Sequence, residues 1–180
     1  YGIIHSHDRH VFVLPEVFCK GYFRWRSEGI KGDKIMIALG CDHGGYDLMQ
    51  EVMAHLDKRG IEYKNFGTFT KDSCDYPEFG RAAAQAVAEK KCDKGIVICT
   101  TGIGISIVAN KVKGIRAAVC HNEFTAQMCR EHNNAQILSM GARVLEEDLA
   151  LRMVEIFLNT EFAGGRHITR VEKMMEIENR

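Results

Sequence analysis

Short apolar segments alternate with longer amphipathic segments along most of this 180-residue chain. The apolar segments have the length and composition of buried strands, and the segments between them have the apolar spacing of helices. Strands that are separated by helices in this way run parallel, and the helices then cover both faces of the sheet. We therefore predict an α/β fold built on a five-stranded parallel sheet.

The pattern places each expected element on the chain. The strands are expected at residues 36–39, 61–66, 95–99, 116–120 and 136–140. The helices are expected at residues 46–59, 77–90, 105–112, 123–132 and 147–158. Gly60 ends the first helix and Pro77 begins the second, and both residues are favoured at those positions. A basic turn at residues 164–170 leads into a C-terminal helical arm that runs to residue 178.

The first 35 residues follow neither the period of a strand nor that of a helix. Met36 is the first methionine, and codons for residues 31–34 can contain a purine-rich ribosome-binding sequence. We interpret residues 1–35 as a poorly structured leader or non-native extension, with a genuine, partly ordered extension as the alternative. The histidines and the aspartate of residues 5–10 could form a metal site, but such a cluster needs a scaffold. Residues 36–180 then form one domain.

Composition excludes several classes of protein. The chain has 24 basic and 24 acidic residues, so no net field draws it to nucleic acid or to an anionic membrane. No apolar run approaches the roughly 18 residues of a membrane span. The seven cysteines include no C-x-x-C pair, which argues against a disulfide framework and against a zinc site. We expect a soluble, cytoplasmic protein without nucleic-acid or membrane partners.

One stretch places a cysteine where chemistry is favoured. Cys99 ends an expected buried strand and is followed by a turn that contains Gly102 and Gly104. These glycines let the backbone approach a ligand closely, and the free N–H groups of the next helix favour negative charge. Cys99 is therefore a candidate nucleophile or base, although a free cysteine can also be a small buried apolar residue. The turn is neither a dinucleotide fingerprint nor a P-loop.

Other polar residues follow the same edge of the expected sheet, where ligands bind in such folds. Asp42 and His43 follow the first strand, Thr101 follows the third and Arg143 follows the fifth. Taken singly, they could be a helix cap, a loop histidine or solvated polar groups. We expect a second group to converge on this edge, and its guanidinium groups suit a phosphate. Its members are His132, Arg166, His167 and Arg170.

The order and spacing of several motifs resemble one enzyme family. The motifs are Asp42-His-Gly-Gly, Asp75-Tyr-Pro, Cys99-Thr-Thr-Gly-Ile-Gly-Ile-Ser, Ala109-Asn-Lys, Gly114-Ile-Arg-Ala, Arg130-Glu-His-Asn-Asn and Gly164-Gly-Arg-His-x-x-Arg-Val. Residues 36–180 resemble the type B ribose-5-phosphate isomerases, the family that also holds allose- and galactose-6-phosphate isomerases. The resemblance implies a Rossmann-like three-layer α/β/α sandwich. It also implies interconversion of ribose 5-phosphate and ribulose 5-phosphate, a pentose phosphate reaction, without a metal or cofactor.

The resemblance implies roles for individual residues as well. Cys99 matches the proton-abstracting cysteine, and His132 matches the histidine that opens the sugar ring. The residues that match the sugar site are Asp42, His43, Tyr76, Thr101 and Asn133. The residues that match the phosphate end are Arg143, Arg166, His167 and Arg170. The family's active sites combine two subunits, so a homodimer or a dimer of dimers is expected.

Two positions compare this chain with branches of the family. Ile105 occupies the position at which a sister branch carries a glutamate base, which supports the cysteine branch. Thr100 stands where relatives often have glycine, so the course of the turn after Cys99 becomes a question for the structure.

The chemistry of an aldose–ketose isomerase requires a base, an acid and a site for an enediolate oxygen. Cys99, His132 and the N–H groups of residues 101–106 can supply these functions, and Thr101 can relay a proton between the two oxygens. A hexose-6-phosphate isomerase, a non-catalytic sugar-phosphate sensor and a redox-active thiol protein are the alternatives. The last lacks a resolving cysteine close to Cys99.

Overall fold

The computed structural model describes residues 35–179, which lie within one compact unit of the chain. Apart from residue 35, the predicted leader at residues 1–35 lies outside this range, and so does the candidate metal cluster at residues 5–10. Both therefore stay predictions.

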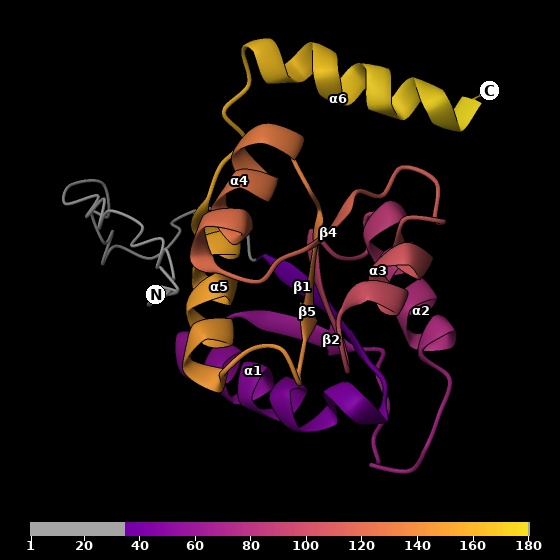
Figure 1. Cartoon of the computed structure of the whole chain (residues 1–180), viewed down its shortest axis with the longest axis vertical. Helices are drawn as coiled ribbons and strands as arrows, with labels where there is room; N and C mark the ends of the chain where they lie inside the picture. Colours follow the sequence, from indigo (N-terminus) through magenta and orange to yellow (C-terminus); the bar gives the residue numbers. More distant parts are fainter. Residues whose placement is uncertain (1–34, 180) are drawn as a thin grey trace, which may run out of the picture. The chain divides into compact units, whose positions relative to one another are not determined.

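A five-stranded sheet forms the centre of the unit (Figure 1). Its strands are β1 (Met36–Cys41), β2 (Glu62–Asn65), β3 (Lys94–Cys99), β4 (Ala117–Val119) and β5 (Ile137–Gly141). The strand order is β2-β1-β3-β5-β4, and every neighbouring pair is parallel. The predicted five-stranded parallel sheet is confirmed.

Helices cover both faces of the sheet, as the predicted three-layer sandwich requires (Figure 1). They are α1 (Tyr46–Arg59), α2 (Tyr76–Ala88), α3 (Ile103–Ala109), α4 (Glu123–Asn133), α5 (Glu147–Asn159) and α6 (Arg166–Glu176), with short 3-10 helices at His43–Gly45 and Ile177–Asn179. Apolar side chains of α1, α4 and α5 pack against one face, and those of α2 and α3 against the other. No helix among residues 35–179 has the length and apolar character that a membrane crossing needs.

The alternation of side chains along β3 decides where Cys99 points. Ile96 and Ile98 belong to the core on the α1, α4 and α5 side, whereas Val97 and Cys99 belong to the core beneath α2 and α3. Successive residues of a strand face opposite sides of the sheet. The thiol therefore lies on the same side as α3, whose first turn follows it in the chain.

The C-terminal arm begins earlier than the sequence pattern indicates. Gly164 and Gly165 have φ values of +64° and +55°, and these two residues alone complete the turn. Glycine reaches such angles without steric cost. Arg166, His167 and Arg170 therefore lie in the first turns of α6 and not in a loop.

Helix α6 and the 3-10 helix after it lie across the end of the sheet at which the strands begin (Figure 1). The backbone N–H of Gly114, just before β4, donates to both carboxylate oxygens of Glu178, at 3.1 and 2.9 Å. The Arg116 guanidinium lies 3.0 Å from the sulfur of Met175. The arm is thus attached to the amino edge of the sheet, opposite the edge at which β3 ends.

Candidate active site

Asp42 and Gly44 bring the loop after β1 against the loop after β3. The buried carboxylate of Asp42 accepts the N–H of Gly45 at 3.0 Å and so caps the first 3-10 helix. A Cβ atom at Gly44 would lie 2.3 Å from Thr100 Oγ1, which is closer than any real contact. The glycine therefore makes room for the threonine hydroxyl, and this accounts for how the turn accommodates Thr100.

His43 has a fixed tautomer when its ring is neutral. Its Nδ1 atom accepts the backbone N–H of Cys74 at 3.2 Å, so the ring proton is on Nε2. The Cys74 sulfur lies 3.8 Å from the same nitrogen. The loop before α2 therefore holds an exposed imidazole that offers an N–H donor to a ligand.

Cys99 is buried at the end of β3, and the N–H of Gly102 donates to its sulfur at 3.1 Å. Gly102 has φ of +78°, and a Cβ atom there would lie 2.8 Å from the carbonyl carbon of Met140. Only glycine fits both the angle and the space. This geometry supplies one hydrogen bond to a thiolate at the point where α3 begins.

Tyr76 and Arg143 complete this edge. The ring of Tyr76 lies against the backbone of Gly104, where a Cβ atom would approach it to 2.7 Å. The backbone N–H of Arg143 donates to the carbonyl of Thr100 at 3.0 Å, and the Arg143 side chain is exposed. The structure thus gathers the carboxyl-edge group, which consists of Asp42, His43, Tyr76, Cys99, Thr101, Gly102, Gly104 and Arg143.

The remaining predicted residues form a separate cluster. The rings of His132, on α4, and His167, on α6, stack with 4.3 Å between their centroids and 7° between their planes. Burial, together with the neighbouring His132, Arg166 and Arg170, lowers the pKa of His167. Arg166 and Arg170 are exposed on the same helix. The amino-edge group is defined here as His132, Asn133, Arg166, His167 and Arg170.

The two groups lie at opposite edges of the sheet, so the predicted convergence of His132 and the arm on Cys99 is wrong within one chain. Cys99 lies opposite Gly141, the last residue of β5. Asn133 lies near the first residue of β5, because Arg116 donates both to the Asn133 carbonyl and to the side chain of Gln136, which directly precedes that strand. A strand of five residues separates these ends by about 13 Å. The physical reason is the direction of α4, which runs antiparallel to the strands and therefore ends at their amino edge.

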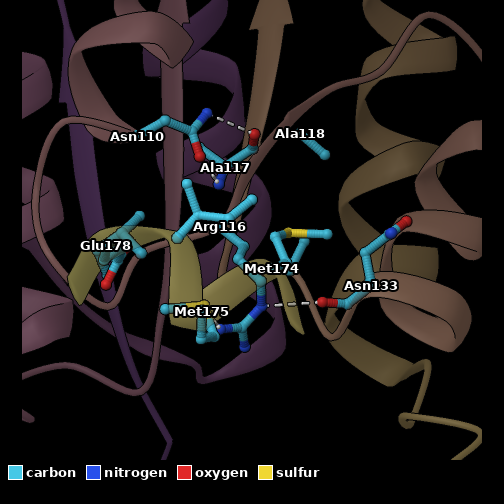
Figure 2. Close-up of a pocket in the computed structure, with 11 residues that line it drawn as sticks. Asn110, Arg116, Ala117, Ala118, Asn133, Met174, Met175 and Glu178 are labelled. Atoms are coloured by element: carbon cyan, nitrogen blue, oxygen red, sulfur yellow. Dashed lines mark hydrogen bonds between the residues drawn. The ribbon is translucent and has the colours of Figure 1, made fainter. Parts of the chain in front are cut away.

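Two arginines that the sequence analysis left without a role hold the end of α4. Arg116 donates to the carbonyl of Asn133 at 2.9 Å (Figure 2) and to that of Asn134 at 2.8 Å. Arg130 is buried and donates to the carbonyls of Ala135 and Thr160, at 2.6 and 3.2 Å. The last carbonyls of a helix lack partners within it, and cations there are favourable. Both arginines therefore fix the turn that carries His132.

A cavity of about 430 Å³ lies beside the amino-edge group, between α6 and the edge strand β4 (Figure 2). Methionine and isoleucine side chains form much of its wall, and Arg116 and Asn133 supply polar groups. The apolar residues that line it include Ile115, Ala117, Ala118, Met174, Met175 and Ile177. Within residues 35–179, no three side chains of the types that bind metals gather into a possible metal site.

Comparison with known proteins shows the enzyme family to which this chain belongs. Residues 37–174 match the family of ribose/galactose isomerases, and the chain belongs to this family. It is 46% identical to ribose-5-phosphate isomerase B of Escherichia coli over 144 residues, and this region covers 80% of this chain and 97% of that protein. A D-erythrulose-4-phosphate isomerase of Pectobacterium atrosepticum is 39% identical over 141 residues, 78% of this chain and 93% of that enzyme.

Solved structures of the family have the same fold. The structure of ribose-5-phosphate isomerase B from Clostridium thermocellum is 56% identical, with a TM-score of 0.80 over 81% of this chain and 98% of that chain. The predicted Rossmann-like α/β/α fold and the predicted family are therefore confirmed.

Proposed function

We propose that this protein is an aldose–ketose isomerase that interconverts ribose 5-phosphate and ribulose 5-phosphate in sites shared by two copies of the chain. Family membership supports the reaction. The observation that carries the shared site is the separation of the carboxyl-edge and amino-edge groups, because Cys99, the candidate base at carbon, lies at the opposite edge of the sheet from Arg166 and Arg170, the candidate cations for the phosphate. Two chains related by a two-fold axis can place each group against its complement.

The carboxyl-edge group supplies the chemistry at carbon. The Cys99 thiolate removes the proton from C2 of the open-chain aldose, and the electron pair forms an enediolate with the carbonyl at C1. The same proton returns to C1, while Thr101 moves a hydroxyl proton between the oxygens at C2 and C1. The N–H groups of Gly102, Ile103 and Ser106 already have partners within the chain. The other N–H groups at residues 101–106 stabilise the enediolate oxygen, so this proposal uses no metal or cofactor.

The amino-edge group of the partner supplies ring opening and phosphate binding. His132 transfers a proton to the ring oxygen as the bond from that oxygen to C1 breaks, and the C1 hydroxyl gives up its proton to water as it becomes the carbonyl. Arg166, His167 and Arg170 bind the phosphate together with Arg143 of the subunit that carries Cys99. The residues left to line the sugar are Asp42, His43, Tyr76 and Asn133.

The cellular setting follows from the same proposal. Every cysteine that the structure describes is free, which fits a reducing compartment, and we place the enzyme in the cytoplasm.

Substrate choice is tested by measuring kcat/KM for ribose 5-phosphate, allose 6-phosphate, galactose 6-phosphate and D-erythrulose 4-phosphate. We expect ribose 5-phosphate to give the highest value. One carbon changes binding by only about 1–3 kcal/mol, so the other substrates should show measurable turnover. A higher value for either hexose phosphate would move the assignment to that branch. Phosphate-dependent binding without turnover of any sugar would identify a sensor.

A further inference from the structure

Ser139 places a hydroxyl group in an otherwise apolar layer beneath α3. It lies on β5, two residues after Ile137, and so shares the face of the sheet that α2 and α3 cover. Its side chain is fully buried, with 0% exposed. A buried hydroxyl without a hydrogen bond is costly, so the partner of this group shows what its position achieves.

That partner is the carbonyl oxygen of Gly102, which accepts the Ser139 hydroxyl at 2.6 Å. The same oxygen accepts the N–H of Ser106 at 3.3 Å, in the first turn of α3. On its other side, Gly102 donates its N–H to the sulfur of Cys99. Ser139 and Cys99 therefore hold the two polar groups of one residue.

Gly102 needs this second anchor because glycine restricts its own backbone so little. Its φ is +78°, and a Cβ atom there would meet the backbone of Met140, so no side chain of its own can help to hold this residue in place. A hydroxyl from the rigid centre of the sheet fixes the carbonyl and, through it, the direction of the N–H.

We propose that Ser139 is a positioning residue for Cys99: through Gly102 it keeps an N–H donor directed at the sulfur. The inference rests on the proposed function for its effect on turnover, and on geometry alone for its effect on the thiol. Ser139 is fully buried, and its hydroxyl donates to Gly102 and not to the sulfur itself. Its removal should slow the steps that need a thiolate and leave substrate binding unchanged.

The experiment compares Ser139→Thr with Ser139→Val, which have nearly the same volume and differ in the hydroxyl. Ser139→Ala removes the hydroxyl without added volume and covers the case in which larger side chains disturb folding. Two quantities are measured for each folded variant. One is the rate at which iodoacetamide alkylates Cys99 at neutral pH, followed by peptide mass spectrometry. The other is the pair of values kcat and KM for ribose 5-phosphate.

Ser139→Val and Ser139→Ala should lower both the alkylation rate and kcat about tenfold, the lower end for a hydrogen bond to a charged group, with KM within about twofold. Ser139→Thr should stay near the original protein in both. Thr160→Val is the control, since it removes a hydroxyl that donates at 2.6 Å to Ile156 at the far end of α5. It should alter stability without changing Cys99 alkylation.

Equal alkylation rates in the threonine, valine and alanine variants would overturn the role of Ser139. Slower alkylation with unchanged kcat would instead confirm the hydrogen-bond chain and overturn Cys99 as the base of the proposed reaction. The two proposals therefore fail in distinguishable ways.

Discussion

The two edges of the sheet hold their polar residues by different physical means. At the carboxyl edge, neighbouring backbone segments lie so close together that only glycine fits between them. A Cβ atom added at Gly141 would lie 2.6 Å from the Thr101 carbonyl carbon, and one added at Gly45 would come still closer to the Ile98 carbonyl oxygen. At the amino edge, side chains do the holding, through arginine hydrogen bonds to the end of α4 and through stacked imidazoles. Close backbone packing therefore positions the polar residues at the carboxyl edge, and interactions between side chains position those at the amino edge.

This difference matches the division of labour in the proposed reaction. Proton transfer at carbon needs atoms fixed closely, which tightly packed turns provide. Phosphate binding needs cations that can reach a ligand, and α6 presents them on an exposed surface. Each edge also exposes apolar side chains, with Ile107 on α3 at 54% and Ile168 on α6 at 47%. A second copy of the chain that joins the two edges would bury them.

The largest effect is expected from the loss of the thiol. Cys99→Ala should lower kcat by about 10²–10⁴-fold with little change in KM, because only proton transfer loses its partner. Cys92→Ala, which removes another buried thiol on the same core face, is the control and should keep turnover. Near-normal kcat in the Cys99 variant would remove this residue from the mechanism.

Close approach at the carboxyl edge can be separated from backbone conformation with two glycines. Gly60 has φ of +65° and open space around it, whereas Gly102 has φ of +78° and the β5 backbone at 2.8 Å. Gly60→Ala should cost about 1–2 kcal/mol of unfolding free energy from the left-handed angle alone. Gly102→Ala should cost about 2 kcal/mol more, because the backbone must shift as well. Equal losses in urea denaturation would contradict the packing argument.

The amino edge should respond in affinity more than in turnover. Arg170→Ala removes a cation–phosphate hydrogen bond of about 1.5–3 kcal/mol that is similar in the ground and transition states. KM should therefore rise by about 10-fold or more while kcat changes little. Lys173→Ala, farther along α6, serves as the control. A collapsed kcat at unchanged KM would place Arg170 at the reacting carbons.

The smallest effect concerns pH. Burial and nearby cations lower the pKa of His167 in the folded protein. In the unfolded chain this histidine has its ordinary pKa of about 6.5, so just below that pH the unfolded chain takes up a proton there more readily than the folded protein does. The associated stability is present above about pH 6.5 and is lost as the pH falls below it. His167→Gln should therefore lose less Tm than the original protein between about pH 7.5 and about pH 5.5. His121→Gln, at an exposed position on the loop after β4, is the control, and equal losses in the original protein and in the His167 variant would refute the prediction.

The fold and the residues of the carboxyl edge could be predicted from the sequence, because both depend on the local residue pattern and on the rule that parallel strands end at the same edge of a sheet. The position of His132 follows from a rule of the same kind, since a helix between parallel strands returns to their amino edge and His132 lies in the last turn of α4. Arg116, Arg130 and Ser139 are different. Their roles depend on which distant carbonyl each side chain reaches once buried, and no spacing in the sequence encodes that.

Subunit complementation tests the shared site most directly. Cys99→Ala protein is mixed with protein that carries Arg166→Ala and Arg170→Ala, each inactive alone at low substrate concentration, and exchange is verified by native mass spectrometry. In a shared site, one site of each heterodimer collects all the changes and the other has none, so activity should return to about half of the original value per heterodimer. Verified exchange with no return of activity would show that Cys99 and the arginines serve the same site from one chain, and would contradict the account.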